Sequence, residues 1–309
     1  MTGSGPPLGS SILLLGANGQ VGYELSRALT ARDGFVALDR AGADLSRPES
    51  LRAVMRRYRP SVIINAAAYT AVDQAESEPD LARDVNAVAP GVLAEAAEEI
   101  GACIVHYSTD YVFDGRKGGA YDETDSPNPL SVYGRTKLAG EEAVRKLASR
   151  HLVFRTSWLL GVHGRNFLKT ILRLAAEGES LNVVADQYGA PTSAELVADV
   201  TVNVLESMLS ASKDDRRWGV YHLAAAGETS WHGCARYVVQ RARELGISLK
   251  ATPEAVVPIS TVDYPAHAAR PANSRLNTEK LRAEFGIKLP DWKSDVDRVL
   301  HQLNSRGES

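Results

Sequence analysis

The chain of 309 residues has very little cysteine, no long apolar run and no excess of charge of either sign. Its two cysteines, Cys103 and Cys234, lie far apart and form no CxxC motif, which excludes a disulfide scaffold and a cysteine-rich zinc module. We expect both to be buried free thiols. Lysine and arginine number 35 against 38 aspartates and glutamates, a net charge of -3. This balance predicts neither a nucleic-acid partner nor binding to an anionic membrane.

The sequence also has no segment typical of membrane insertion or export. The longest aliphatic run, Ile12–Leu15, is much too short to span a bilayer. Residues 1–10 are rich in Gly, Ser and Pro and have neither the basic start nor the apolar stretch of a signal peptide. We therefore expect a cytoplasmic protein whose first ten residues form a flexible tail.

Short apolar runs alternate with amphipathic stretches in the first half of the chain. The apolar runs predict strands at 11–15, 35–38, 61–65, 103–107 and 152–156. The amphipathic stretches predict helices at 20–31, 79–100 and 130–149. Ser46-Arg47-Pro48-Glu49 predicts a capping box that opens a further helix ending at Tyr58. This alternation favours an α/β fold, a Rossmann-type doubly wound parallel sheet with helices on both faces.

The pattern becomes less regular after about residue 160. Helices are predicted at 166–176, 194–209, 231–245 and 291–303, and short strands at 181–184 and 220–223. We expect residues 11–160 to form the Rossmann domain and residues 161–309 to form mainly a smaller C-terminal lobe that is interleaved with the sheet.

A glycine loop follows the first predicted strand and opens the first predicted helix. Gly16 permits the tight turn, Gly19 allows backbone N–H groups to approach a pyrophosphate, and Gly22 allows close packing of helix and strand. The helix N-terminus adds the positive end of its dipole at Gln20 and Val21. This context favours dinucleotide binding over a plain tight turn, although the GxxGxxG spacing differs from the GxGxxG of many dehydrogenases.

The residues after the second predicted strand give conflicting signals about the cofactor. Asp39 is the acid expected about 20 residues beyond the loop, where a carboxylate accepts a hydrogen bond from a ribose 2′-hydroxyl and favours NAD. Arg40 follows directly and could hold the 2′-phosphate of NADP. Asp44 and Leu45 are candidates for a loop beside the adenine, or simply for the turn that enters the next helix. NADPH and NADH both stay open on this evidence.

Tyr133 and Lys137 lie at positions i and i+4 of a predicted helix and therefore on one face. A neighbouring ammonium favours a phenolate, so we expect Lys137 to lower the pKa of Tyr133 toward a range useful in acid–base catalysis. Lys137 can also bind a nicotinamide ribose. Ser108 or Thr109, at the carboxyl end of the fourth strand, can donate a hydrogen bond to a substrate carbonyl.

Together these residues resemble the extended short-chain dehydrogenase/reductase family, and within it the reductases of dTDP-linked 4-keto-6-deoxyhexoses that end dTDP-L-rhamnose synthesis. The resemblance runs from residue 19 to 278 through motifs that include GQVGYEL, NAAAYTAVDQAESEP, VHYSTDYVFDG, PLSVYGRTKLAGE and DQYGAPTSAE. It implies that hydride from NADPH, or from NADH in a dual-specificity enzyme, reduces the C4 ketone.

The resemblance also implies roles for individual residues. Tyr133 donates the proton, Lys137 binds the cofactor ribose, and Thr109 stands where the family usually has serine. The positions that match the cofactor wall are Ala68, Tyr69, Thr70 and Tyr107. The positions that match the sugar and nucleotide side are Asp110, Trp158, Asn166, Gln187 and Arg275, of which Arg275 suits a diphosphate by its fork shape. Some relatives bind Mg²⁺ at a dimer contact through glutamates that match Glu24 and Glu195. The sequence therefore leaves open whether a metal binds and whether the protein is a monomer or a homodimer.

Three other functions are compatible with this fold. A 4,6-dehydratase needs an Asp-Glu pair, but Asp110 is followed by Tyr111. An epimerase would regenerate its cofactor in each turnover, whereas a reductase consumes it. A non-catalytic, NADP-binding regulatory subunit would have no need for Thr109, Tyr133 and Lys137 together, so the sequence favours an enzyme.

Overall fold

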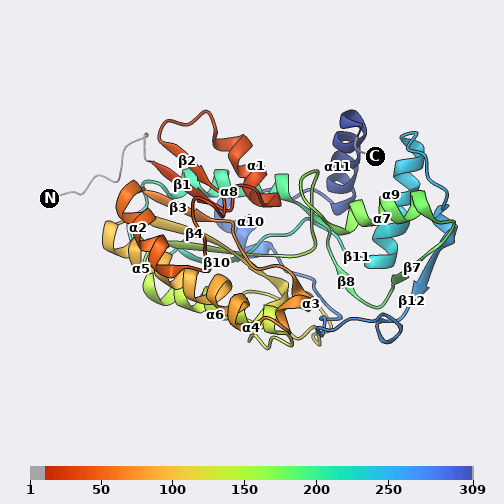
Figure 1. The fold of residues 1–309 in the computed structure, drawn as a ribbon, viewed down its shortest axis with the longest axis horizontal. Helices are drawn as coiled ribbons and strands as arrows, with labels where there is room; N and C mark the ends of the chain where they lie inside the picture. The colour runs from red at the N-terminus through yellow and green to blue at the C-terminus, as the bar shows by residue number, and fades with distance from the viewer. Residues whose placement is uncertain (1–10, 308–309) are drawn as a thin grey trace.

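The computed structural model describes residues 11–307 of the chain. The predicted tail of residues 1–10 lies outside this range. A six-stranded parallel sheet fills one half of the molecule, with strand order β10-β5-β4-β3-β1-β2. Its strands are β1 (Ile12–Leu15), β2 (Phe35–Leu38), β3 (Val62–Asn65), β4 (Cys103–Thr109), β5 (His151–Thr156) and β10 (Gly219–His222). The predicted Rossmann-type α/β fold is confirmed (Figure 1).

Successive residues of each strand enter two different cores because side chains alternate across a sheet. Ile12 and Leu14 of β1 pack on one face, and Leu13 and Leu15 pack on the other. The first face is covered by α1 (Gln20–Leu29) and α8 (Ala194–Met208). The second is covered by α2 (Pro48–Tyr58), α5 (Ala89–Ile100) and α6 (Val132–Leu147). Burial on both faces explains why these strands are continuous apolar runs.

The other half of the molecule lies beside the carboxyl ends of the strands (Figure 1). Its elements include α7 (Phe167–Glu177), α9 (Trp231–Glu244), α11 (Trp292–Arg306), β7 (Leu181–Val184) and β12 (Val256–Ile259). Strand β12 pairs with β7 in parallel. The chain returns from this half to complete the sheet, because β10 pairs with β5 at the sheet edge.

Two predicted helix features are corrected by the structure. The capping box at Ser46 does not form: α2 begins after Arg47 without a side-chain cap, and the carboxylate of Asp44, in place of Glu49, accepts from the Ser46 backbone nitrogen at 3.0 Å and from the Ser46 hydroxyl at 2.8 Å. The predicted helix 79–100 is three segments, α4 (Pro79–Arg83), a π-helical turn η1 (Asp84–Val88) and α5. Single π turns inside helices frequently mark functional sites. The buried free state predicted for Cys103 and Cys234 is confirmed.

Several short elements had no prediction. They are α3 (Val72–Ala75), η2 (Asp110–Val112), η3 (Pro253–Ala255), η4 (Thr261–Asp263), α10 (Glu279–Phe285) and the two-residue strands β6 (Leu159–Leu160), β8 (Tyr188–Gly189), β9 (Thr192–Ser193) and β11 (Thr229–Ser230). Among the described residues, no helix is long and apolar enough to cross a membrane.

Candidate active site

The glycine loop brings β1, α1 and the end of β3 into close contact. Gly16 has a φ of +84°, and a Cβ on it would lie 2.6 Å from the backbone nitrogen of Ala67. A Cβ on Gly22 would lie 2.0 Å from the carbonyl oxygen of Gly16. Both positions therefore require glycine. Helix α1 starts after Gly19 without a side-chain cap, which leaves first-turn N–H groups available to an anion.

A cleft of about 560 Å³ opens beside this loop. Its lining includes ten of the residues predicted to bind the cofactor: Gly16, Gly19, Gln20, Val21, Asp39, Asp44, Leu45, Ala68, Tyr69 and Thr70. Gly22 supports the loop from behind. The cleft also includes Asn18 and Arg165, which the sequence analysis missed: Asn18 is a variable position of the glycine loop, and Arg165 lies outside the recognised motifs. At Gly16 and Gly22 an added side chain would clash with the backbone, so the loop forms a tight backbone cradle that fits a dinucleotide.

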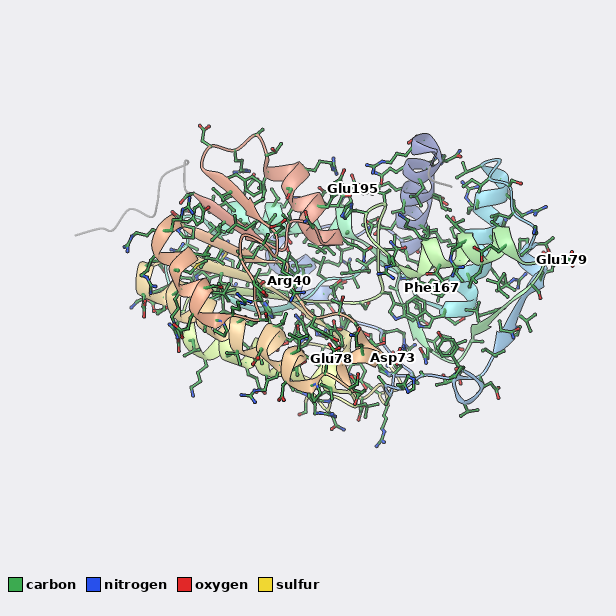
Figure 2. The ribbon with its side chains drawn as sticks, viewed as in Figure 1. Arg40, Asp73, Glu78, Phe167, Glu179 and Glu195 are labelled. Carbon is green, nitrogen blue, oxygen red and sulfur yellow. The ribbon has the colours of Figure 1, made fainter. Side chains whose placement is uncertain are left out.

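Asp39 and Arg40, which gave conflicting signals about the cofactor, differ in their hydrogen bonds and in their exposure. One carboxylate oxygen of Asp39 accepts hydrogen bonds from the backbone nitrogens of Ala41 and Gly42 at 3.0 and 3.1 Å, and the other accepts one from Asn18. Arg40 points to solvent with 79% of its side chain exposed, and its guanidinium lies 3.6 Å from Asp44. Asp39 thus shapes the turn, whereas Arg40 is free to reach an anion at the rim of the cleft (Figure 2).

Asn86 holds the wall of the cleft in place. This buried side chain lies in the π-helical turn; its amide oxygen accepts from the backbone nitrogen of Tyr69, and its amide nitrogen donates to the Tyr69 carbonyl and to Thr136 of α6. The Tyr69 hydroxyl donates to Glu78 at 2.8 Å. Asn86 therefore links the cofactor wall to the helix that carries Tyr133. The sequence analysis missed it because its partners are far away along the chain.

The three predicted catalytic residues meet at the carboxyl end of β4. Ser131 caps α6 by accepting from the Gly134 backbone nitrogen, which fixes the first turn and with it Tyr133. A Cβ on Gly134 would lie 2.3 Å from the Tyr111 carbonyl oxygen, so glycine lets this turn approach η2. Thr109 is the last residue of β4, and its hydroxyl donates to Asp110. Of the two candidate hydroxyls, Thr109 is the one that acts on Tyr133 through a hydrogen bond.

Lys137 is buried and does not lower the pKa of Tyr133 as the sequence predicted. Its ammonium donates to the backbone carbonyl of Tyr107 at 2.5 Å. Burial raises the pKa of Tyr133 to about 12; the Thr109 hydroxyl acts against this rise and Asp110 adds to it. Burial lowers the pKa of Lys137 to about 8. In the protein alone, the phenol is therefore a fully protonated proton donor. The Tyr107 hydroxyl faces elsewhere and bonds Thr201 at 2.8 Å, so only its carbonyl belongs to the site.

Buried polar atoms without partners gather where β4 and β5 end. Among the described residues, Ser108 Oγ, Asp110 Oδ2, Thr156 Oγ1 and Ser157 Oγ are buried and unpaired. Thr109 and Thr156 are register partners on these two strands. Each unpaired buried group costs about 1–3 kcal/mol, so a group of them at one sheet edge indicates a polar ligand. Burial raises the pKa of Asp110 to about 6.

The predicted substrate residues are distributed around this edge, and some already have partners. Trp158 has a φ of +48° and stacks on Trp231 with ring centroids 3.5 Å apart. Asn166 caps α7 and donates to Gln20 of the glycine loop at 2.9 Å. Gln187 donates to Thr261.

Each nitrogen of the Arg275 guanidinium makes one hydrogen bond with the surrounding protein. It donates to Asn273, to Glu228 and to the Gly118 carbonyl at 2.8–3.0 Å. Three of its five N–H groups are thus engaged, and its role in diphosphate binding stays a prediction.

The two glutamates considered for Mg²⁺ come together around an arginine. Arg27 donates to Glu24 at 2.8 Å and to Glu195 at 2.9 Å. Glu195 also accepts from Gln302. No group of three potential metal-ligating side chains is present in residues 11–307. Within this chain, Arg27 pairs with both carboxylates and Arg298 lies 3.8 Å from Glu195, so the pair does not fit a metal.

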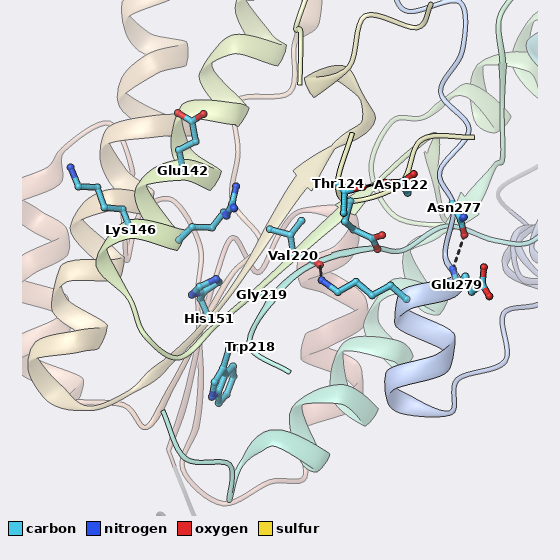
Figure 3. Close-up of a pocket in the computed structure, with 13 residues that line it drawn as sticks. Asp122, Thr124, Glu142, Lys146, His151, Trp218, Gly219, Val220, Asn277 and Glu279 are labelled. Carbon is cyan, nitrogen blue, oxygen red and sulfur yellow. Dashed lines mark hydrogen bonds between the residues drawn. The ribbon is translucent and has the colours of Figure 1, made fainter. Parts of the chain in front are cut away.

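A larger cleft, of about 960 Å³, lies away from these residues along the edge strand β10 (Figure 3). Lys280 donates to the Val220 carbonyl, and Glu123 accepts from the His222 backbone nitrogen. These charged side chains satisfy the exposed edge of the sheet, which blocks pairing with another strand. The cleft contains none of the catalytic residues, so we regard it as structural.

The parallel sheet, the glycine cradle and the Tyr133–Lys137 pair at a strand end define a nicotinamide-dependent oxidoreductase of the short-chain dehydrogenase/reductase class. The family model described as the RmlD substrate binding domain matches residues 10–305, and the chain belongs to this family.

Curated relatives cover nearly the whole chain. The dTDP-4-dehydrorhamnose reductase of Shigella flexneri is 49% identical over 297 residues, which are 95% of this chain and 98% of the relative. That of Escherichia coli K12 is 48% identical with the same coverage. The solved structure of the Bacillus anthracis dTDP-4-dehydrorhamnose reductase, in complex with NADP, is 36% identical; it matches with a TM-score of 0.86 and covers 95% of this chain and 99% of that one.

Proposed function

We propose that this protein is a dTDP-4-dehydrorhamnose reductase, which reduces the C4 ketone of dTDP-4-dehydro-L-rhamnose to give dTDP-L-rhamnose, the last step of dTDP-rhamnose synthesis. The structural observation that carries the proposal is the meeting of Tyr133 with Thr109 at the carboxyl end of β4, on the same edge of the sheet as the glycine cradle. The near-full-length identity to curated reductases of this substrate supports it. The protein is accordingly an oxidoreductase, and we infer that it works in the cytoplasm.

NADPH supplies the hydride when it is bound. The first-turn amides of α1 and the loop at Gly19 suit its pyrophosphate, and Arg40 at the cleft rim suits a 2′-phosphate. The complex of the Bacillus anthracis relative with NADP supports NADPH as the cofactor. We assign no metal a role, because Arg27 pairs with both glutamates considered for it.

The residues at the strand ends prepare the ketone for reduction. Thr109, whose hydroxyl donates to Asp110 in the protein alone, redirects this proton to the C4 oxygen and holds that oxygen beside the Tyr133 phenol. The phenol donates a proton as negative charge develops on the oxygen. Lys137, held by the Tyr107 carbonyl, presents its remaining ammonium protons to the cofactor ribose. Asp110 and Trp158 contact the sugar, and the unpaired hydroxyls of Ser108 and Ser157 provide further hydrogen bonds.

The proposal is tested by adding dTDP-4-dehydro-L-rhamnose and NADPH or NADH to the purified protein. We expect consumption of one reduced nicotinamide per sugar and formation of dTDP-L-rhamnose, identified by NMR. Sugar conversion without net cofactor consumption would instead indicate an epimerase. Tight cofactor binding without any turnover would indicate a regulatory subunit.

A further inference from the structure

A short segment that leads into the C-terminal half is docked on the glycine loop. It comprises residues 161–166, between β6 and α7, and Figure 2 shows Phe167, the first residue of α7, in the C-terminal half. The His163 ring donates from Nε2 to the backbone carbonyl of Asn18 at 3.0 Å. It also stacks on Tyr23 of α1, with ring centroids 4.6 Å apart. His163 therefore holds this segment, which we call the clasp, against the start of α1.

The clasp also contacts the side chain of Gln20, the first residue of α1. Asn166 donates to the Gln20 amide oxygen at 2.9 Å. Gly164 has a φ of +72°, and a Cβ on it would lie 3.3 Å from Cγ of Gln20, so glycine suits this close approach. Because Asn18 and Gln20 flank Gly19, the clasp is fixed on both sides of the residue expected beside the pyrophosphate.

Arg165 lines the cofactor cleft from this clasp. Nearly all other residues that line the cleft of about 560 Å³ come from the Rossmann half. Arg165 is exposed and makes no hydrogen bond or ion pair with residues 11–307. The same cleft is lined by the glycine loop and the first turn of α1, which has no side-chain cap. An unpaired guanidinium and uncapped helix amides in one cleft suit an anion.

Arg165 also lines a second cleft, of about 770 Å³, together with Lys169 and Arg173 of α7. The other two cations of this cleft are engaged: Arg173 pairs with Glu177 at 2.8 Å, and Lys169 donates to a backbone carbonyl at 3.1 Å. Helix α7 starts there with a side-chain cap from Asn166, so this cleft lacks the uncapped amides of the cofactor cleft. The cofactor cleft is therefore the better place for an anion bound by Arg165.

The two arginines of the cofactor cleft belong to different parts of it. Arg40 follows β2 and lies 3.6 Å from Asp44, close to where the ribose 2′ position is expected. Arg165 belongs to a segment that His163 fixes to the glycine loop. We therefore expect the two side chains to meet different phosphates of NADPH.

We propose that Arg165 binds the pyrophosphate of the cofactor, and so adds a contact from the clasp to those made by the glycine loop. Arg165 contributes equally to the binding of NADPH and NADH, because both contain the pyrophosphate, whereas Arg40 acts only on the 2′-phosphate. Cofactor binding then ties the clasp, and with it the start of α7, to the Rossmann half. This proposal rests on the proposed function for the identity of the cofactor.

The test is a fluorescence titration of NADPH and of NADH, without sugar, into the wild type and two matched arginine variants. Arg165→Gln should weaken binding of both cofactors about 10-fold, as expected for loss of a charge-assisted hydrogen bond. Arg173→Gln, which removes a cation of the second cleft only, should bind both like the wild type. Unchanged affinity in Arg165→Gln, a loss confined to NADPH, or equal losses in the two variants would each overturn the proposal.

Turnover provides a second measurement. Arg165→Gln should raise KM for NADPH with little change in kcat, because Tyr133 and Thr109 are untouched, and Arg165→Lys, which keeps the charge without the fork, should have an intermediate KM. A lower kcat at unchanged KM would contradict the role of Arg165. A wild type that binds NADPH but does not reduce the ketone refutes the proposed function alone, whereas wild-type NADPH affinity in Arg165→Gln refutes this proposal alone.

Discussion

Lys137 donates a hydrogen bond to the backbone carbonyl of Tyr107, 2.5 Å away. Its ammonium is therefore directed at the sheet, and burial raises the pKa of the Tyr133 phenol and keeps it protonated. The lysine is thus fixed to the sheet, and Thr109 and Asp110 determine the immediate surroundings of the phenol. The helix therefore has two separate tasks: Tyr133 keeps the proton that is donated, and the ammonium of Lys137 places a positive charge close to the cofactor cleft.

Tyr133→Phe removes the proton donor while keeping the ring that packs on Tyr111. We expect kcat to fall about 10²- to 10⁴-fold, because the developing alkoxide loses its general acid, with little change in the dissociation constant of NADPH. Steady-state kinetics and a fluorescence titration with NADPH measure the two effects. Turnover close to that of the wild type would show that another group donates the proton.

Lys137→Met retains the length of the side chain and removes its charge. We expect both weaker NADPH binding and a lower kcat. In the wild type, the pKa of about 8 means that the ammonium is lost as the pH rises through 8. NADPH affinity should therefore decline above pH 8 in the wild type and be independent of pH over this range in the variant. If NADPH affinity changed with pH in the same way in both proteins, the Lys137 ammonium would have no role in binding the cofactor.

Arg40→Ala tests which residue reads the 2′ position of the cofactor. Because Arg40 is exposed and Asp39 is engaged with its own turn, we expect the variant to lose preference for NADPH over NADH. Asp39→Ala, with Arg40 kept, should shift the preference toward NADPH. The ratio of kcat/KM for the two cofactors is the measurement, and a ratio unchanged in both variants would assign the selectivity to other residues.

Asp110→Asn should stabilise the protein while impairing activity. The folded state raises the pKa of Asp110 to about 6 by burial, above the unfolded value of about 3.9. The charged carboxylate therefore opposes folding fully above pH 6, and this penalty disappears as the pH falls from 6 to 4. We expect a gain on the order of 1–3 kcal/mol in the free energy of unfolding at pH 7.5. Urea denaturation at pH 7.5 and 4 should show the gain only at the higher pH.

The helix that carries Tyr133 is anchored by a buried ion pair. Arg155 of β5 donates to Glu141 of α6 through Nε and Nη2, at 2.9 and 2.5 Å, and both side chains are almost fully buried. Glu141→Gln leaves the guanidinium charge without a counter-ion and should cost about 3–5 kcal/mol of stability. Glu141→Met with Arg155→Met should recover much of this loss, because no unpaired charge remains. Urea denaturation of the three proteins measures the difference.

The strands and helices of the first half were predictable because each strand is buried on both faces and each helix has one apolar face. The carboxyl-end position of Thr109 and the i, i+4 pair of Tyr133 and Lys137 followed from the same periodicity. Strand β12 was missed because its half-exposed sequence, Val256–Ile259, contains a proline. The capping box failed because Asp44, two residues from Ser46, accepts from the Ser46 backbone nitrogen, the donor that Glu49 was expected to bind.

The parts of the site that could not be predicted depend on contacts between distant segments. Asn86 and Tyr69 are separated by 17 residues, and Asn18 and His163 by 145. The pKa of Tyr133 was expected to fall because the sequence shows the neighbouring lysine, but it does not show how deeply both groups are buried.

The return of the chain to the sheet at β10 has a consequence for dissection of the molecule. A fragment that stops near residue 160 would lack the sixth strand and also α8, which covers the face of the sheet opposite α6. Such a fragment would expose Leu14 and Val105 to water and should aggregate when expressed alone. The two halves are therefore one cooperative unit, and a single cut between them in the intact protein should leave both pieces associated until a denaturant is added.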